Sequence, residues 1–465
     1  MIPLTLEQLA DVVGGELVDD ADGGRRVDDV TIDSRTARAG SLFVPLPGEH
    51  VDGHDYLTDA AARGAAGMLV EAGWPLPGTP GAIVVDDAAD ALLGLGAWVR
   101  DTADPAVVAV TGSNGKTTTK DLIAAAVGAG RQVVANVGSY NNELGVPLTF
   151  CRLELGSEVL VAEIGARGAG QIAGLMPLVR PDVAVVTTVA GAHLEFFGTI
   201  DAVAAAKGEL VEGLAPDGLA VLNADDPRVA AMADRAPGRI ATYGRADDAD
   251  WRAEDVRLDG LARARFRVRD VDVRLPVPGE HNVGNALAAL AVADACGVPL
   301  GDAAAALETA LVSRWRMQLE RTADDVTILN DAYNANPASM ESALKTLAQL
   351  DVPGRRWAVL GRMAELGAGG EPAHDRIGRL AIRLGVDGLV VVGEDARAIR
   401  DAADQEGFYG QGDCYLAADV DEAVALLSPR LRPGDAVLVK ASRSVGLERV
   451  VERLGTAAPD GGPPA

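Results

Sequence analysis

V-V-A-V-T-G-S-N-G-K-T-T-T-K (107–120) is the stretch of sequence that decides the fold. The apolar run that ends at Thr111 predicts a buried strand, two glycines predict a tight turn, and a helical pattern begins at Lys116. A strand, a glycine-rich turn, a Lys-Thr pair and a helix are the context of a P-loop. Val110 stands where the common motif has its first glycine, so this loop is the shorter G-x-x-G-K-T form. An ordinary glycine turn with a surface lysine is the alternative, and both flanks argue against it.

A loop of this kind predicts a site for nucleotide phosphates. Backbone N–H groups of the turn and of the helix N-terminus point at phosphate oxygens. Lys116 brings a positive charge to the β- and γ-phosphates, and the Thr117 hydroxyl is a ligand for Mg²⁺. The chain holds only five lysines, which makes a lysine retained here more significant. The predicted nucleotide-binding residues of the loop are Gly112, Ser113, Asn114, Gly115, Lys116, Thr117 and Thr118.

The residues around the loop alternate between short Val/Ala/Ile runs and helical patterns, which is typical of a parallel sheet buried on both faces. The expected strands of this middle block are 107–111, 159–165, 183–188 and 219–222. Stricter alternation at 263–268 and 272–277 predicts an antiparallel pair, followed by a helix at 283–297. A later block repeats the rhythm, with strands expected at 326–331, 357–362, 388–393 and 436–441. The first block is smaller, with strands expected at 42–46 and 82–86 and a helix at 59–65.

These patterns predict an α/β protein of three domains. Residues 1–103 form a small N-terminal α/β domain, 104–313 a central P-loop domain with a parallel mononucleotide-binding sheet, and 314–465 a Rossmann-like domain. The Pro/Gly-rich tail, 456–465, is expected to be disordered.

The composition excludes several classes of protein. A formal net charge of -26 with no basic stripe argues against binding of nucleic acid. No apolar run approaches the ~20 residues of a membrane span, and the N-terminus does not read as a signal peptide. Cys151, Cys296 and Cys414 are too scattered for a disulfide framework or a zinc site. We therefore expect a cytoplasmic protein without membrane insertion.

Two more strands of the middle block end in polar groups. Glu163 ends the second strand, and His193 follows the third. Ligands of open α/β sheets bind at the carboxyl ends of the strands, and a carboxylate and an imidazole beside a triphosphate suit Mg²⁺. A surface carboxylate at a strand end and a capping loop histidine are the alternatives.

Other polar residues are weak signals one by one. Lys207 lies in a helical pattern, where a solvated helix face is an equally good interpretation. His281 and Asn282 stand where a loop enters a helix, so that Asn282 alone would serve as an N-cap. Asp331 and Asn334 follow a strand of the third block, where they form plain turns or hold a ribose and base.

The joint order of these motifs resembles the Mur ligase family over nearly the whole chain. Besides the loop, the motifs are T-I-D-S-R-T-A-R-A-G-S-L-F-V-P-L-P-G (31–48), S-Y-N-N-E-L-G-V-P (139–147), A-E-I-G-A (162–166), G-E-H-N-V-G-N-A-L (279–287), D-A-Y-N-A-N-P-A-S-M (331–340), G-R-M-A-E-L-G (361–367) and V-L-V-K-A-S-R (437–443). The segment at 331–340 is most similar to the member that adds D-alanyl-D-alanine. The D-N-P-R motif of the third-residue-adding member is absent, and the D-S-R segment argues against a folylpolyglutamate ligase.

The resemblance implies roles for single residues. Glu163, His193 and Lys207 would serve two magnesium ions, with Lys207 converted to a carbamate. Asn141 and Asn142 would position phosphate and substrate, and His281, Asn282 and Asn334 would face the nucleotide. Arg316 would reach the phosphates and Asp331 the ribose, both from the third domain. Asp33, Ser34 and Arg35 would help hold a UDP-sugar.

The resemblance also implies a reaction. An ATP-dependent ligase of peptidoglycan precursor synthesis, acting as a monomer, would join D-alanyl-D-alanine to UDP-N-acetylmuramoyl-tripeptide through an acyl phosphate. The products would be the UDP-pentapeptide, ADP and phosphate. A nucleotide-dependent switch or motor would use the P-loop without ligation, but it leaves the asparagine-rich motifs unexplained. An inactive paralogue would not retain Lys116, Glu163, His193 and Lys207 together.

Overall fold

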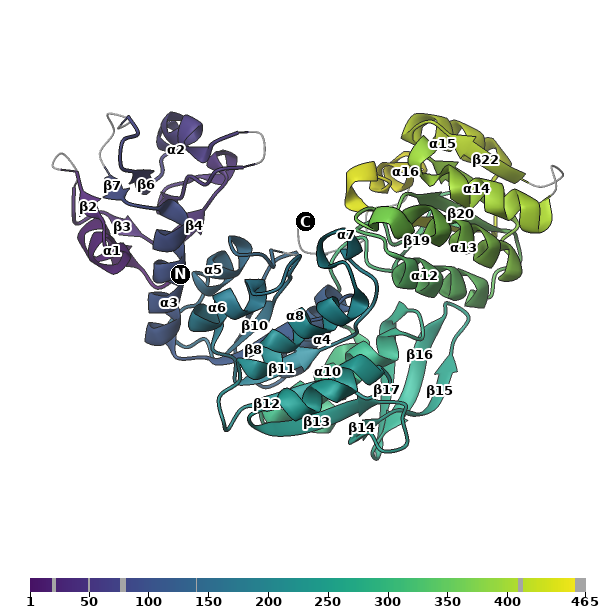
Figure 1. The fold of residues 1–465 in the computed structure, drawn as a ribbon, viewed down its shortest axis with the longest axis horizontal. Coiled ribbons are helices and arrows are strands. Elements are labelled where there is room, and N and C mark those ends of the chain that lie inside the picture. Colours follow the sequence, from purple (N-terminus) through teal and green to yellow (C-terminus); the bar gives the residue numbers. More distant parts are fainter. Residues whose placement is uncertain (19–21, 49–50, 76–80, 139, 409–412, 456–465) are drawn as a thin grey trace.

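The computed structural model describes residues 1–18, 22–48, 51–75, 81–138, 140–408 and 413–455 (Figure 1). Three α/β lobes follow one another along the chain, and we name them the N-terminal unit (1–87), the central unit (88–313) and the third unit (314–455). The predicted disordered tail, 456–465, lies outside the described residues.

The central unit is built on a seven-stranded sheet in the order β14-β13-β12-β11-β8-β10-β9. Every pairing in it is parallel, as the apolar runs predicted. The strands are β8 (Ala106–Thr111), β9 (Val133–Ala135), β10 (Val159–Glu163), β11 (Val183–Val186), β12 (Leu219–Asn223), β13 (Arg239–Gly244) and β14 (Trp251–Arg252). β8 lies between β10 and β11, so the three predicted polar strand ends meet at one edge of the sheet.

Helices cover both faces of this sheet because alternate strand residues point to opposite sides. Val108 and Val110 of β8 share a core with α4 (Lys116–Gly128), α10 (Asn282–Ala295) and α11 (Leu300–Glu308). Val107 and Ala109 share a core on the other face with helices α3, α5, α6 and α8. Their bounds are Ala88–Ala103, Gly145–Phe150, Gln171–Val179 and Ile200–Glu212, and two short helices, α7 (Leu194–Phe197) and α9 (Pro227–Ala230), complete the set.

A three-stranded antiparallel sheet completes the central unit. Its strands are β15 (Glu254–Leu258), β16 (Arg263–Val268) and β17 (Val271–Pro278). The predicted pairing of the last two is confirmed, with Phe266 opposite Val273. Their alternate apolar residues close the α4/α10 side of the main core.

The N-terminal unit has a five-stranded sheet in the order β2-β7-β6-β5-β4. The strands are β2 (Glu16–Leu17), β4 (Asp29–Thr31), β5 (Ser41–Phe43), β6 (Gly67–Glu71) and β7 (Ala82–Val85), and β1 (Leu4–Thr5) pairs separately with β3 (Arg26–Val27). Its helices are α1 (Leu6–Val13) and α2 (Leu57–Ala62). Thr5 caps α1 in a capping box with Gln8, and Gly14 ends it at φ 66.

The third unit has a six-stranded sheet in the order β18-β19-β23-β20-β21-β22. The strands are β18 (Gln318–Arg321), β19 (Thr327–Asn330), β20 (Arg356–Gly361), β21 (Gly388–Val392), β22 (Asp413–Ala417) and β23 (Ala436–Lys440). Only β18 runs antiparallel to its neighbour. The helices are α12 (Pro337–Gln349), α13 (Gly370–Arg383), α14 (Arg397–Ala403), α15 (Val420–Leu427) and α16 (Glu448–Arg453), in two layers around the sheet.

Candidate active site

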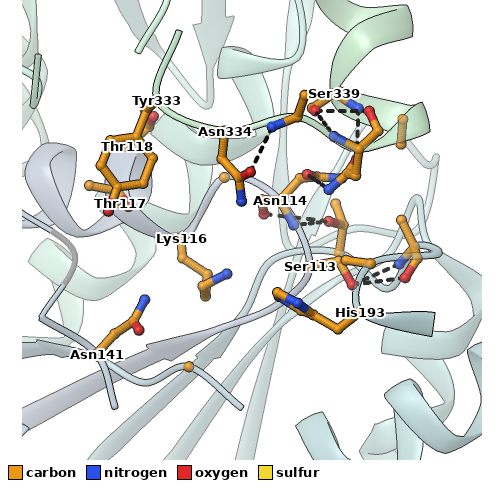
Figure 2. A pocket seen from close by; sticks show the side chains of 18 of the residues that line it. Ser113, Asn114, Lys116, Thr117, Thr118, Asn141, His193, Tyr333, Asn334 and Ser339 are labelled. Carbon is orange, nitrogen blue, oxygen red and sulfur yellow. Dashed lines mark hydrogen bonds between the residues drawn. The ribbon is translucent and has the colours of Figure 1, made fainter. Parts of the chain in front are cut away.

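A cleft of about 1110 Å³ lies between the central and third units (Figure 2). Both units line it, and the N-terminal unit contributes no lining residue among those described. The predicted site residues that line the cleft are Ser113, Asn114, Gly115, Lys116, Thr117, Thr118, Asn141, Asn142, Glu163, His193, Lys207, His281, Arg316, Asp331 and Asn334.

The P-loop conformation requires its two glycines. Gly112 has a φ of 144, and a Cβ there would lie 2.0 Å from Thr187 Oγ1. Gly115 has a φ of 81, and a Cβ there would lie 2.6 Å from Asn285 Oδ1. Both positions combine a left-handed backbone with close approach, which only glycine tolerates.

Hydrogen bonds from the segment that follows strand β11 hold the loop in place. Thr187 Oγ1 donates to the Asn114 carbonyl over 2.6 Å, and the amide of Ala190 donates to Ser113 Oγ over 2.9 Å. Lys116 crosses the loop, and its Nζ donates to the Gly112 carbonyl over 3.0 Å. Burial lowers the pKa of Lys116, and the nearby Glu163 opposes that shift.

Glu163 is the last residue of β10 and is buried. Its Oε1 accepts a hydrogen bond from Asn141 Nδ2 over 2.5 Å. Its Oε2 is buried without a hydrogen-bond partner among the described residues. An unsatisfied carboxylate oxygen in such a place is expected where an ion binds.

The imidazole and the lysine predicted beside Glu163 also reach the cleft. His193 has a left-handed backbone, with φ 57, and burial lowers its pKa. Lys207 lies on the buried face of α8 and not on its solvated face, since the residue is only 2% exposed. Burial first, and then the charge of Lys116, lower the pKa of Lys207 to about 7. Its Nζ donates to the Ala166 carbonyl over 3.3 Å.

The donor set fits Mg²⁺ better than a metal that takes all its ligands from the protein. The described residues hold no group of three or more His, Cys, Asp or Glu side chains arranged for a metal ion. Mg²⁺ uses one or two carboxylates together with substrate phosphates and water. The free Oε2 of Glu163, the His193 ring and the Thr117 hydroxyl offer such a partial shell.

Arg316 enters the P-loop from the start of the third unit. Its Nη2 donates to Thr117 Oγ1 over 3.1 Å, and its Cζ lies 4.0 Å from the centroid of the Tyr333 ring. Trp315 and Met317 on either side have left-handed φ values of 61 and 52. Two strained residues in a row of three indicate a loop that is fixed by its surroundings.

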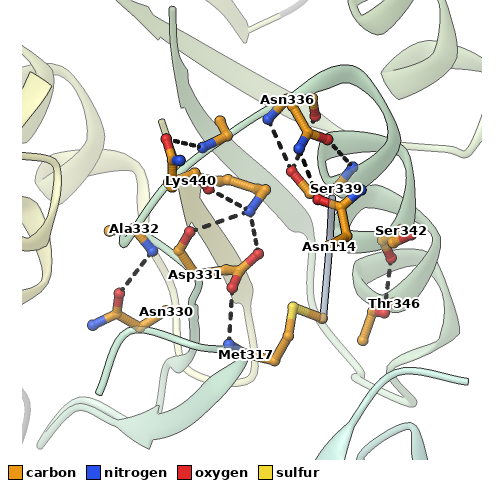
Figure 3. Close-up of polar contacts among 12 residues, drawn as sticks. Asn114, Met317, Asn330, Asp331, Ala332, Asn336, Ser339, Ser342, Thr346 and Lys440 are labelled. Atoms are coloured by element: carbon orange, nitrogen blue, oxygen red, sulfur yellow. Dashed lines mark hydrogen bonds and ion pairs between the residues drawn. The ribbon is translucent and has the colours of Figure 1, made fainter. Parts of the chain in front are cut away.

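Asp331 and Lys440 are the groups that fix this loop (Figure 3). Asp331 Oδ1 accepts the amide of Met317 over 3.0 Å, and its Oδ2 forms an ion pair with Lys440. Lys440 Nζ also donates to the Asn334 carbonyl over 2.8 Å. The V-L-V-K-A-S-R motif contained Lys440, but nothing in the sequence linked it to Asp331.

A second contact joins the two units at Asn114. Asn336 Nδ2 donates to Asn114 Oδ1 over 2.7 Å (Figure 3). Asn336 also caps α12, where its Oδ1 accepts the amide of Ser339 over 3.0 Å. The start of α12 is therefore set directly against the P-loop.

Asn282 lies behind the loop and is not among the residues that line the cleft. Its Nδ2 donates to the Pro278 carbonyl over 2.8 Å, and its Oδ1 accepts from Asn285 Nδ2 over 2.8 Å. Asn285 Oδ1 in turn accepts from Thr119 Oγ1 over 3.1 Å. Through these bonds the two asparagines of α10 are linked to Thr119 of α4, the helix that follows the loop, and so they support the loop.

Asn142 Oδ1 accepts the amide of Gly145 over 2.9 Å, at the start of α5. Its neighbour Asn141 turns toward Glu163, so one of the two asparagines bonds to the carboxylate and the other bonds to the start of a helix.

Glu365 is a cleft residue to which sequence reasoning assigned no role. It follows β20 in the third unit and forms an ion pair with His193 of the central unit. Its carboxylate also lies 3.5 Å from the guanidinium of Arg167. Its partners are far away in sequence, so no local pattern indicates the contact.

The three residues predicted for the UDP-sugar lie in the N-terminal unit, away from the cleft lining. Asp33 caps the short 3-10 helix η1 (Ser34–Thr36) and forms an ion pair with Arg35 at 2.7 Å. The hydrogen bond from Arg35 holds the pKa of Asp33 below its usual value. Arg35 is largely exposed, so it is accessible to an anionic ligand.

None of the helices in the described part of the chain combines the length and the apolar character needed to cross a membrane.

Comparison with known proteins gives three family matches. Residues 26–91 match "Mur ligase family, catalytic domain", residues 110–293 match "Mur ligase middle domain", and residues 315–443 match "Mur ligase, glutamate ligase domain".

Curated relatives are similar over almost their full length. A UDP-N-acetylmuramoyl-tripeptide--D-alanyl-D-alanine ligase of Mycobacterium tuberculosis is 43% identical, with 98% of each chain covered. The protein of the same name from Escherichia coli is 37% identical, with 98% of this chain and 99% of the relative covered.

Solved structures are also similar to this chain over most of its length. MurF from Acinetobacter baumannii superposes with a TM-score of 0.86 at 31% identity, covering 97% of this chain and 98% of that one. The MurF ligase of Thermotoga maritima, solved in complex with ADP, gives 0.78 at 28% identity, covering 92% and 97%.

Proposed function

The chain belongs to the Mur ligase family, and we infer that it is the ATP-dependent ligase that joins D-alanyl-D-alanine to UDP-N-acetylmuramoyl-tripeptide. The observation that carries this inference is similarity over 98% of both chains to a relative named for this reaction. The products are the UDP-pentapeptide, ADP and phosphate, so the enzyme serves the synthesis of peptidoglycan precursors.

The first half of the reaction activates a carboxylate, which is a poor electrophile. The terminal carboxylate of the tripeptide attacks the γ-phosphorus of ATP, the bond to the β-phosphate oxygen breaks, and an acyl phosphate and ADP result. Two anions have to approach each other in this step. Lys116 and Arg316, from opposite sides of the cleft, offset their repulsion and the charge of the transition state.

We propose that Mg²⁺ binds between the P-loop and the end of β10. Thr117, Glu163 and His193 would hold it, and it would neutralise the phosphate charge that builds up during transfer. The buried Oε2 of Glu163 supports this site, because it has no protein partner among the described residues.

We propose that Lys207 carries a carbamate. The amine attacks carbon dioxide, a C–N bond forms and one proton is released, so only the uncharged amine reacts. A pKa of about 7 leaves a large share of this buried amine uncharged at neutral pH. The carbamate would place a second negative group beside Glu163 and support a second magnesium ion.

The second half of the reaction forms the amide. The amine of D-alanyl-D-alanine attacks the acyl carbon, a tetrahedral intermediate forms, the nitrogen releases one proton, and phosphate leaves as the C–O bond breaks. Water would hydrolyse the acyl phosphate, so it has to be kept out. The contacts of Arg316 with Thr117 and of Asn336 with Asn114 hold the third unit against the P-loop and would help to exclude water.

We propose the remaining assignments from their positions. His281, Asp331 and Asn334 line the cleft and would face the nucleoside, and Asn141 and Asn142 would lie between phosphate and substrate. Asn282 supports the loop instead of touching the nucleotide. Asp33, Ser34 and Arg35 would hold the UDP part on the N-terminal unit. The enzyme is proposed to act as a monomer in the cytoplasm.

The test is phosphate release from ATP by the purified protein with Mg²⁺, UDP-muramoyl tripeptide and D-alanyl-D-alanine, each omitted in turn. We expect release to require both substrates and the UDP-pentapeptide to appear by mass spectrometry. ATP cleavage at an equal rate without the substrates would contradict the assignment and favour a nucleotide switch.

A further inference from the structure

One contact at the site crosses from the third unit to the proposed metal site. The carboxylate of Glu365 forms an ion pair with His193 Nδ1, although 172 residues separate them. Both side chains are partly buried in the cleft wall, at 28% and 26% exposure, so the contact is only partly screened by solvent.

The backbone conformation and three contacts fix the position of Glu365. Its φ of 60 is left-handed, which a residue with a side chain adopts only when the surroundings impose it. The Glu365 carbonyl accepts the amide of Glu195 over 3.1 Å, two residues after His193. Arg167 approaches the other carboxylate oxygen at 3.5 Å. Three groups of the central unit thus hold one residue of the third.

The contact decides which nitrogen of His193 carries the proton. A carboxylate only accepts hydrogen bonds, so Nδ1 has to donate, and the neutral ring then keeps its lone pair on Nε2. Among the residues that the structure describes, nothing forms a hydrogen bond with Nε2. An imidazole with one nitrogen fixed by a carboxylate and the other unoccupied is the usual arrangement of a metal-binding histidine.

We propose that Glu365 is a positioning residue that fixes the Nδ1–H tautomer of His193, so that the metal site of the central unit is complete only when the third unit is docked. The inference rests on the metal site proposed above. It assigns a role in metal binding to a residue that would not touch the metal.

Docking and metal binding are then coupled. If the docked third unit raises the affinity for the cation by some factor, the cation raises the stability of docking by the same factor. The affinity for magnesium would be lower when the third unit is undocked. A bound nucleotide-metal complex would in turn keep the third unit docked while the acyl phosphate exists.

The first test is binding of Mn²⁺ in place of Mg²⁺, measured by electron paramagnetic resonance with a non-hydrolysable ATP analogue and without D-alanyl-D-alanine. We expect Glu365→Ala to weaken Mn²⁺ binding about 10- to 100-fold, the usual effect of removing such a partner. Glu365→Gln keeps an oxygen that accepts from Nδ1, so it is expected to restore most of the affinity. Glu371→Ala, an exposed glutamate on α13, is the matched control and should bind as the wild type does.

The second test reads the tautomer itself. The chain has five histidines, so ¹⁵N-labelled histidine gives few enough signals to assign His193 by its absence in His193→Gln. In multiple-bond ¹H–¹⁵N spectra of the metal-free protein we expect a protonated Nδ1 in the wild type and a shift toward the Nε2–H form in Glu365→Ala.

Wild-type Mn²⁺ affinity in folded Glu365→Ala would overturn the inference, as would an unchanged His193 tautomer. If that variant instead showed a raised KM for D-alanyl-D-alanine with normal Mn²⁺ binding, Glu365 would belong to acceptor recognition. A wild-type protein that binds Mn²⁺ but makes no pentapeptide would contradict the proposed function while leaving this inference standing.

Discussion

Arg316 Nη2 donates a hydrogen bond to Thr117 Oγ1 over 3.1 Å, across 199 residues of sequence. The first residue of the third unit to enter the cleft thus touches the P-loop hydroxyl that is proposed to bind Mg²⁺. An arginine held this way is in place before the phosphates arrive, so little reorganisation is needed during the reaction.

The first prediction concerns this arginine. Arg316→Ala is expected to lower kcat for pentapeptide formation about 10²- to 10³-fold, the range seen when one donor to a developing oxyanion is lost. Arg316→Lys should recover only part of it, because lysine lacks the planar fork and the stacking on Tyr333. Arg314→Ala is the control, since Arg314 is exposed and does not line the cleft. Equal losses in both variants would contradict the assignment.

The second prediction concerns the shape of the P-loop. Gly112→Ala would force a Cβ to within 2.0 Å of Thr187 Oγ1, so the loop must move. We expect the affinity for ADP, measured by calorimetry, to fall about tenfold or more, since each ~1.4 kcal/mol of strain corresponds to that factor. Gly128→Ala, in the last turn of α4 with nothing within 4 Å, should bind ADP normally. Normal binding by Gly112→Ala would show that the loop does not need its glycine there.

The third prediction concerns the buried pair of Lys440 and Asp331. Lys440→Met leaves a buried carboxylate without its cation, and we expect the free energy of unfolding in urea to drop by about 3–5 kcal/mol. The double variant with Asp331→Asn should lose less than Lys440→Met alone. Lys345→Met removes an exposed pair with Glu341 and should cost only about 0.2–0.5 kcal/mol. A small effect for Lys440→Met would mean that the pair does not hold the Arg316 loop.

The fourth prediction concerns Lys207 and carbon dioxide. Below a pKa of about 7 the amine is protonated and cannot react, so activity should fall as the pH drops through that value. Removal of dissolved carbon dioxide should lower activity at pH 7 and bicarbonate should restore it. A ¹³C-bicarbonate NMR experiment is expected to give one carbamate signal, absent in Lys207→Ala and retained in Lys345→Ala. Full activity of Lys207→Ala would show that a carbamate on Lys207 is not needed for the reaction.

Much of the fold was predictable because buried parallel strands read as continuous apolar runs. The strand from Val107 to Thr111 and its neighbours at 159–165 and 183–188 were expected and are present as β8, β10 and β11. Short edge strands such as β9 and β14 were missed, since two or three residues leave no periodic pattern.

The site residues also fall into two groups: those that the local sequence indicates and those that depend on contacts made only in the folded chain. Residues in or beside the P-loop were predictable, because local turn chemistry indicates them. Asn282 was predicted to face the nucleotide; its side chain bonds to Pro278 and Asn285, contacts that a single sequence does not reveal because it does not show which face of a helix start turns inward. Glu365 and Lys440 act through partners more than 100 residues away, and only the folded chain brings those together.

The distribution of lysines has a practical consequence. Of the five, Lys120, Lys207 and Lys440 are 2% exposed, and Lys116 lies in the cleft, so Lys345 is the one on open surface. Reagents that modify primary amines should therefore attach to Lys345 and to the chain terminus. A dye or a solid support can be coupled on α12 in this way, and a bound nucleotide should shield the amines of Lys116, Lys207 and Lys440 that line the cleft.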